Sequence, residues 1–151
     1  MVISNLLIGA IFPSAQKLIK EDKKLFLPVY KHSLITLFRW LGPIAFLVAI
    51  FSRPLLEYGF GTEYGASAPT LALLMLAAVL AWLNAPSGTI FLALNRQSLY
   101  MWGTLISLIV NLILNMILLP TIGTIGAAIA TVATELALLA WSLTFIKKHL
   151  L

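Results

Sequence analysis

The stretch LYMWGTLISLIVNLILNMILLPTIGTIGAAIATVATELALLAWSLTFIKK, residues Leu99–Lys148, decides the fold of this chain. From Leu99 to Leu119 no side chain is strongly ionised, and this length makes a helix of about 31 Å, the thickness of the hydrocarbon core of a bilayer. We expect Pro120 and Gly123 to break this helix, and Ile125–Ile146 forms a second apolar run that ends in two lysines. The stretch therefore predicts an antiparallel pair of transmembrane helices joined by a tight, uncharged turn.

Each helix of this pair carries a polar stripe. At 100° per residue, the polar side chains of the first helix fall within an arc of about 80°. They are Thr104, Ser107, Asn111 and Asn115. An arc of about 100° on the second helix holds Ala127, Thr131, Thr134, Glu135 and Ser142, with Leu138 interrupting it. Because such polar groups are costly against hydrocarbon, we expect the stripes to face each other, another helix or water.

The composition is that of a polytopic membrane protein with an all-α fold. Hydrophobic residues make up 61% of the chain and charged residues 10%, with a mean hydropathy of +1.02, whereas soluble domains average about 45 to 50% and about 25%. The chain has no cysteine, which excludes a disulfide framework, a thiolate nucleophile and a cysteine metal site. The net charge of +5 comes mostly from loops between spans, so it indicates topology and not a nucleic-acid partner.

The first third of the chain holds a partial span and a complete one. Residues 1–16 form an apolar segment too short to span, which looks like the tail of a longer helix. The lysine-rich segment Gln16–Lys31 follows, either as a solvated loop or partly on the membrane surface. The next span is expected from Leu34 to Phe51 and contains Arg39.

A third span is expected in the middle of the chain. The glycine-rich segment Arg53–Pro69 predicts an irregular loop before it. The span itself covers Thr70–Leu94 and is interrupted at Asn84–Thr89, where Pro86 removes a backbone donor, so we expect a structural kink. A short turn, NRQS, then leads into the central pair, which gives four full spans after the partial one.

The cations are distributed unevenly between the two sides of these spans. Arg53 lies on one side and Arg39 lies within a span, and the other eight share the opposite side: Lys17, Lys20, Lys23, Lys24, Lys31, Arg96, Lys147 and Lys148. The positive-inside rule places this larger set, and the C-terminus, in the cytoplasm of a plasma membrane. The N-terminus would then lie outside without a signal peptide, so we expect the chain to be a C-terminal piece of a longer protein or a truncated reading frame.

Four residues are candidates for lining a cavity, and each has a structural alternative. Arg39 either extends its side chain to the interface or faces a cavity and pairs with an anionic substrate. Glu135 lies near mid-span, where it either makes a helix contact, protonated or ionised, or lines a wet cavity and takes part in ion coupling. Asn111 and Asn115 either join helices or bind substrate.

The sequence shows no catalytic constellation. It contains neither HExxH nor GxxxxGK, and Glu135 is the one carboxylate expected inside the membrane. We therefore predict no enzymatic activity, no metal site and no cofactor.

Several phrases resemble those of a known family. The segment NLILNMILLPTIGTIGAAIATVATE, Asn111–Glu135, resembles the N..LN..L.P..G..GAAIAT..SE pattern that joins two late transmembrane helices in polysaccharide and O-antigen flippases. LLEYGFGTEYGASAPTLALL is similar to their loop with an fG..Y..A pattern, and IFPSAQKL is similar to their earlier P..S.L stretch. Within the central pattern Thr134 stands where serine is more usual.

These flippases belong to the multidrug, oligosaccharidyl-lipid and polysaccharide exporter superfamily. The resemblance implies a bundle in two lobes around a cavity that moves undecaprenyl-diphosphate-linked oligosaccharide across the bacterial inner membrane, for lipopolysaccharide or other surface polysaccharide. Residues 1–151 would form most of the C-terminal lobe, so its partners would be the lipid-linked oligosaccharide, membrane lipids, and an N-terminal half or a second copy. Arg39, Asn111, Asn115 and Glu135 are the residues expected to line the cavity.

Other functions stay open at this point. A drug or lipid II exporter of the same superfamily would share these features. A membrane-embedded glycosyl- or acyltransferase fragment would need an acidic or histidine motif that these residues do not show. The chain could also be a non-functional remnant of a longer gene.

Overall fold

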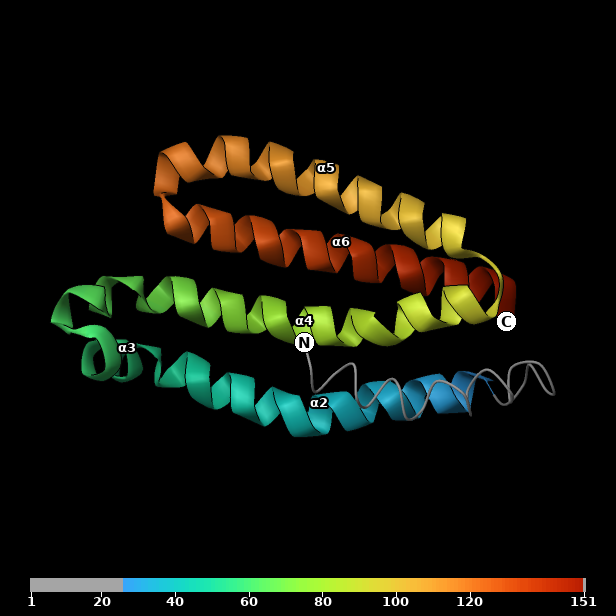
Figure 1. Ribbon diagram of the computed structural model, residues 1–151, viewed down its shortest axis with the longest axis horizontal. Helices are drawn as coiled ribbons and strands as arrows, with labels where there is room; N and C mark the ends of the chain where they lie inside the picture. The colour runs from blue at the N-terminus through green and yellow to red at the C-terminus, as the bar shows by residue number, and fades with distance from the viewer. Residues whose placement is uncertain (1–25, 151) are drawn as a thin grey trace.

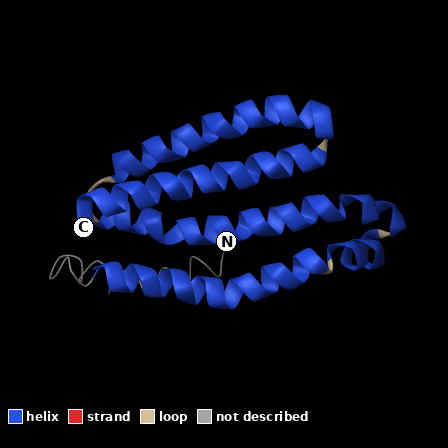
Figure 2. Cartoon of the chain, turned by 180° about the vertical axis from the view of Figure 1, so that it is seen from behind, coloured by secondary structure: helices blue, strands red, loops and turns tan. Residues whose placement is uncertain are grey.

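The computed structural model describes residues 26–150, and this range is helical apart from short turns, with no strand (Figure 2). Its elements are α2 (Phe26–Ile50), α3 (Ser52–Phe60), the 3-10 helix η2 (Thr62–Ser67), α4 (Ala68–Ala93), α5 (Gln97–Ile122) and α6 (Thr124–Leu150). Four stretches are long and apolar enough to cross a membrane: Tyr30–Ile50, Thr62–Leu92, Gln97–Ile122 and Thr124–Lys148. The predicted all-α polytopic fold with four full spans is confirmed, while the predicted partial span 1–16 lies outside the described residues.

The four long helices lie side by side in a row, in the order α2, α4, α6, α5 (Figure 1). The extensive contacts are those between neighbours in this row, α2 with α4, α4 with α6, and α6 with α5. Consecutive helices in the sequence run in opposite directions, so α5 and α6 form the predicted antiparallel pair. The helix α6 therefore lies between α4 and α5 and contacts both.

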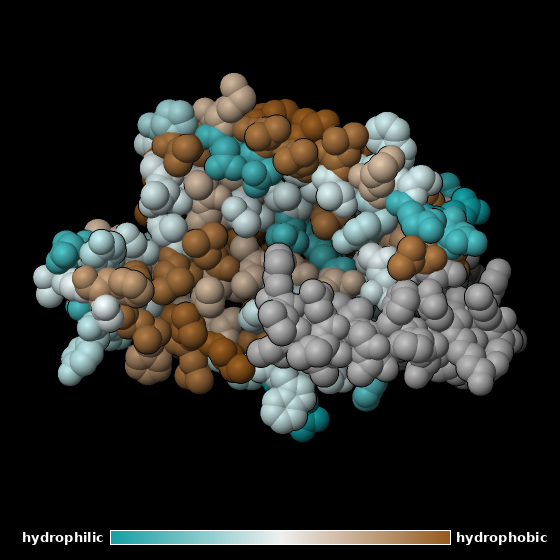
Figure 3. Space-filling model, viewed as in Figure 1, coloured by the Kyte–Doolittle hydropathy of each residue, from teal (hydrophilic) through white to brown (hydrophobic). Residues whose placement is uncertain are grey.

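Apart from Arg39, which lies within α2, the cationic side chains of the described residues lie at the two opposite ends of the long helices. Lys31, Arg96, Lys147 and Lys148 belong to the end where α2 begins and α6 finishes, whereas Arg53 lies at the other end, in α3 (Figure 1). Hydrophilic side chains gather at both ends in the space-filling view, and apolar side chains cover the outer edge of α5 (Figure 3). This grouping of cations agrees with the predicted topology, and the assignment of the basic end to the cytoplasm stays a prediction.

The first described span starts earlier than the sequence indicates. We expected it from Leu34, but the chain is already helical at Phe26, the first described residue, within the segment predicted as a lysine-rich loop or surface segment. Tertiary contacts explain the difference, because Tyr30 is 4% exposed in a cluster with Ile90, Phe91 and Ile146. Burial of a large apolar side chain contributes about 1.5 to 3 kcal/mol, which favours the helical conformation of this segment.

The segment after this span is helical, so the predicted irregular loop Arg53–Pro69 is wrong. It forms α3 and η2, separated by Gly61. Within α3 the Nε atom of Arg53 donates to Oε1 of Glu57 at 2.8 Å, one helical turn away. Gly61 has a φ of 117°, which favours glycine and ends α3 there. The high glycine content thus marks one helix boundary and not a loop throughout.

The turn between α5 and α6 is made by Gly123 alone. The helix α5 continues through Pro120 to Ile122, so the expected break at this proline is wrong. Pro120 offers no N–H to the carbonyl of Met116 four residues before it, and this single missing bond does not stop the helix. Beside it, Oγ1 of Thr121 donates to the carbonyl oxygens of Ile117 and Leu118 at 3.1 and 3.0 Å. Gly123 adopts a φ of 63° and α6 starts at the next residue, so the predicted tight, uncharged turn is confirmed.

The turn between α4 and α5 reverses the chain at Asn95, which has a φ of 56°. Its N–H donates to the carbonyl of Leu92 at 3.1 Å, and the N–H of Arg96 donates to the carbonyl of Phe91 at 2.7 Å. This pair of bonds is the Schellman arrangement, in which asparagine tolerates the left-handed conformation. The helix α4 before it runs unbroken from Ala68 to Ala93, so the predicted interruption at Asn84–Thr89 is not present.

Small residues allow the closest approach between α5 and α6. Ala130, one turn before Thr134, is 0% exposed. A Cβ atom on Gly126 would overlap the backbone carbonyl of Leu118, and one on Gly103 would overlap the ring of Trp141. Without a hydrophobic force between helices in lipid, such close packing of small side chains holds transmembrane helices together. It also keeps the polar side chains of α5 and α6 within hydrogen-bonding distance.

Candidate functional site: a polar row across three helices

Two adjacent residues of α6 connect it to both of its neighbours. Thr134 faces α5, where Nδ2 of Asn111 donates to its Oγ1 at 2.9 Å. Glu135 faces α4, where Nδ2 of Asn84 donates to its Oε2 at 2.8 Å and to its backbone carbonyl at 3.0 Å. Successive residues on a helix point 100° apart, so one helix in the middle of a row can serve both neighbours in this way.

The row continues along α5 by one helical turn. Nδ2 of Asn115 donates to Oδ1 and to the carbonyl oxygen of Asn111, both at 3.0 Å. The Oγ1 atom of Thr134 in turn donates to the carbonyl of Ala130 at 2.7 Å. We call the five side chains of Asn84, Glu135, Thr134, Asn111 and Asn115 the polar row. It places amide, hydroxyl and carboxyl groups across α4, α6 and α5 near the middle of their spans.

The members of the polar row differ in burial. Asn84 is 3% exposed, and its Oδ1 has no hydrogen-bond partner, while the other four residues are half-buried. Half-buried amide and carboxyl oxygens leave acceptor sites open toward whatever covers this part of the bundle. In hydrocarbon such groups would be costly, so they favour a polar neighbour or water beside the row.

Three of the four predicted cavity residues therefore belong to the polar row. Asn115 bonds to Asn111 and Asn111 bonds to Thr134, while Glu135 is the next residue after Thr134 in the chain and bonds to Asn84. The sequence analysis treated Asn84 only as part of a kink, yet it is the side-chain partner of Glu135. The available signal was a carboxamide inside an apolar run, a residue type that is rare in a lipid-facing span.

Arg39 lies apart from the polar row. On α2, Leu37 and Ala45 are 7% and 3% exposed on the side packed against α4. Arg39 follows Leu37 by two residues, which turns it by about 200° to the opposite face, and it is exposed. Within residues 26–150 no ion pair involves it. A role of Arg39 in a cavity would thus need protein beyond this bundle, and its role stays a prediction.

A second polar contact joins α2 to α4 nearer the basic end. The hydroxyls of Tyr30 and Ser87 are 3.1 Å apart, and Ser87 is 0% exposed. The ring of Tyr30 packs in the same cluster as Ile90 and Phe91. This contact fixes α2 on α4 at one end of the bundle, while the polar row fixes α4 on α6 further along.

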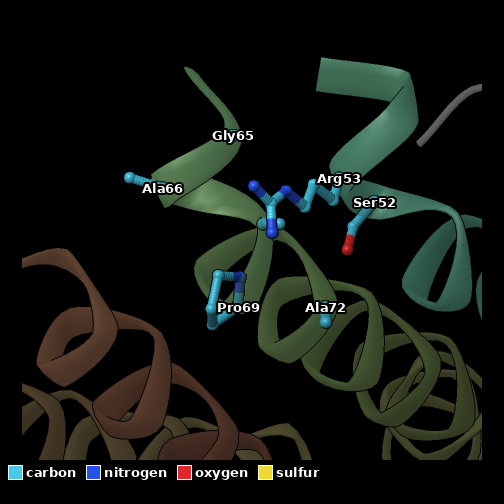
Figure 4. Close-up of a pocket in the computed structure, with 7 residues that line it drawn as sticks. Ser52, Arg53, Gly65, Ala66, Pro69 and Ala72 are labelled. Atoms are coloured by element: carbon cyan, nitrogen blue, oxygen red, sulfur yellow. The ribbon is translucent and has the colours of Figure 1, made fainter. Parts of the chain in front are cut away.

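A hollow of about 510 Å³ lies at the opposite end of the bundle, where α3 and η2 meet α4 (Figure 4). The described residues that line it are Ser52, Arg53, Gly65, Ala66, Ala68, Pro69 and Ala72. The four predicted cavity residues are not among them. The hydrogen bond and the negative charge of Glu57 raise the pKa of Arg53 above its ordinary value, so the guanidinium beside the hollow is charged. No three histidine or acidic residues within 26–150 are grouped to hold a metal ion.

Four spanning helices in a row, with polar side chains between three of them, define an all-α, multi-pass membrane protein. The chain is similar to the probable low-salt glycan biosynthesis flippase Agl15 of Haloferax volcanii, with 30% identity over 132 residues. This similarity covers 87% of the chain and 28% of that relative. An uncharacterized membrane protein of Methanocaldococcus jannaschii is 29% identical over 149 residues, 95% of the chain and 29% of the relative.

The chain therefore spans less than a third of the length of these two curated relatives. No family model matches the sequence, and no solved structure matches it significantly. The comparisons relate the chain to membrane proteins, one of them named for flipping in glycan biosynthesis.

Proposed function

We propose that the chain is part of a transporter that flips a lipid-linked oligosaccharide across a membrane for the synthesis of surface glycan. The observation that carries this proposal is the similarity to a probable glycan biosynthesis flippase, which extends over 132 residues and thus over most of the described bundle. The finer points, an undecaprenyl-diphosphate carrier and a bacterial inner membrane with the C-terminus in the cytoplasm, are part of the same proposal.

The polar row suits such a substrate. A lipid-linked oligosaccharide has a polar sugar and phosphate part that must cross hydrocarbon and an apolar tail that can stay in it. Amide and carboxyl oxygens at mid-span offer hydrogen-bond partners for sugar hydroxyls on one side of α4, α6 and α5. Flipping breaks no covalent bond, so the proposal assigns a transporter and not an enzyme.

The described bundle supports this role only as a part of a larger assembly. Four helices in a row have two open faces and enclose no channel of their own. In the proposed transporter, an N-terminal half or a second copy of the chain covers the face that carries the polar row. The two parts then rock against each other and expose the row to each side of the membrane in turn.

The test compares substitutions in the polar row with a matched neighbour, in the cell that encodes the gene. Asn111→Leu and Glu135→Gln should each reduce the surface glycan while the protein is present at normal amounts in the membrane. Leu136→Ala alters a 49% exposed apolar side chain next to Glu135 and should leave the glycan unchanged. Arg39→Ala tests the predicted contact with the diphosphate in the same assay, with Arg39→Lys as its charge-preserving control.

Normal glycan in the Asn111 and Glu135 variants would reject the polar row as the site. A deletion that leaves the surface glycan intact but changes the sensitivity to drugs would reject the glycan substrate and favour the drug exporter instead. Western blotting of membranes separates both results from a simple loss of protein.

A further inference from the structure

The short helix α3 differs in direction from the rest of the bundle. The four long helices lie across the view in Figure 1, whereas α3 is seen nearly end-on at the end opposite the chain's C-terminus. A single residue, Phe51, separates it from α2, whose spanning part ends at Ile50. The next spanning stretch starts at Thr62. The depth of α3 is therefore fixed at the boundary of the membrane by the spans on both sides.

One face of α3 is apolar and open. At 100° per residue, Phe51, Leu55 and Tyr58 fall within an arc of about 60°, and they are 53%, 50% and 99% exposed. Arg53 and Glu57 are centred about 150° from that arc and pair with each other at 2.8 Å. Up to Tyr58 the helix thus separates apolar from charged side chains, although it is too short to span. Phe60 at its end, 69% exposed, lies outside this apolar arc and on the side of Arg53.

The last turns of α2, just before α3, also expose apolar side chains. Phe46, Leu47 and Ile50, in the last turns of α2, are 65%, 54% and 56% exposed, and Phe51 and Leu55 follow directly. Leaving these side chains in water would cost about 25 cal/mol for each Å² of exposed apolar surface, compared with burying that surface in an apolar environment. Aromatic side chains such as Tyr58 are favoured where hydrocarbon meets the head groups.

We propose that α3 lies flat in the membrane–water interface and binds phospholipid there. Phe51, Leu55 and Tyr58 insert between the upper parts of the acyl chains, and Arg53 with Glu57 stays at the level of the head groups. The guanidinium of Arg53, with 74% of its side chain exposed, is available to a lipid phosphate while Glu57 holds its Nε. In this arrangement α3 sets the depth and tilt of α2 and α4, and the inference holds independently of the transported substrate.

Single-cysteine variants test this depth directly, because the chain has no cysteine of its own. A spin label is attached to Tyr58→Cys in the full chain, reconstituted in vesicles of phosphatidylcholine and phosphatidylglycerol. Its collision rates with oxygen, which concentrates in lipid, and with a water-soluble nickel chelate are then compared. Leu55→Cys reports on the same face, Phe46→Cys is a reference within the span, and Arg96→Cys, in the turn between α4 and α5, is the water-exposed reference.

The expected result is a ratio of oxygen to nickel collisions at Tyr58 and Leu55 that is several-fold higher than at Arg96 and lower than at Phe46. A ratio equal to that of Arg96 would overturn the proposal, because α3 would then lie in water. Low collision rates with both reagents would overturn it as well, since they would show that protein covers this face. Leu55→Cys keeps the test decisive if the Tyr58 variant does not insert.

Discussion

The bond between Asn84 and Glu135 allows a quantitative test of how α4 is held on α6. Asn84→Ala removes two hydrogen bonds, one to the carboxyl group and one to the backbone carbonyl of Glu135. Hydrogen bonds between transmembrane helices contribute about 0.6 kcal/mol each on average and at most about 1.7 kcal/mol. The substitution should therefore lower the free energy of unfolding by about 1 kcal/mol. The unpartnered Oδ1 of Asn84 adds nothing to this loss.

A double-mutant cycle isolates the side-chain bond. Glu135→Ala removes the bond to Oε2 and leaves the backbone carbonyl in place, so the two single variants share one interaction. Their coupling energy should be about 0.6 kcal/mol and should not exceed about 1.7 kcal/mol. The assay is the free energy of unfolding of the purified chain in lipid bicelles, measured for the parent, both single variants and the double variant.

The control is the cycle between Asn84 and Asn115, which lie on α4 and α5 and share no hydrogen bond in the structure. Its coupling energy should be close to zero. If the Asn84–Glu135 cycle gives the same value as this control, the two side chains do not interact in the membrane. The polar row would then join only α5 and α6, and α4 would have no side-chain contact with it.

Three further substitutions test other parts of the bundle. Gly103→Leu should cost about 1 to 3 kcal/mol of unfolding free energy, because its Cβ would overlap the ring of Trp141 on α6. Gly123→Val should cost about 1 to 3 kcal/mol, because φ is 63° at this turn and β-branched residues avoid that region. Glu57→Gln should leave the stability at neutral pH unchanged within error, because the ion pair with Arg53 is exposed. Because Glu57 raises the pKa of Arg53 in the folded protein, the contribution of this ion pair to stability is fully present below the ordinary pKa of arginine. It is lost only as the pH rises through the raised pKa, far above neutral.

Controls for these variants are available in the same chain. Gly59→Ala places a Cβ where no atom lies within 4 Å, so it should not destabilise the protein by steric overlap. Unfolding in bicelles measures all of them. An unchanged stability for Gly103→Leu would show that α5 and α6 do not approach as closely as the structure has them, and an unchanged stability for Gly123→Val would refute the single-residue turn.

The sequence by itself determined how many helices span and where most of them reverse. Apolar length sets the number of spans, since each must match the hydrocarbon thickness, and Gly123 marks the turn because a left-handed backbone favours glycine. The local sequence pattern predicted the wrong conformation at two places, Pro120 and the segment before Leu34. Pro120 does not end α5, which continues to Ile122 and stops at Gly123. The segment around Tyr30 is helical and not a loop, and Tyr30 is buried there by residues far along the chain.

In the polar row, too, the sequence determined one part and tertiary packing decided the other. Helical periodicity placed Asn111, Thr134 and Glu135 on stripes, since residue spacing fixes the direction of each side chain about its own axis. It could not supply the partner of Glu135, which is Asn84 on α4. The order of the helices in the row decided that pairing, and this order follows from contacts between distant segments. One-dimensional spacing describes the faces of a helix, and only packing in three dimensions decides what each face meets.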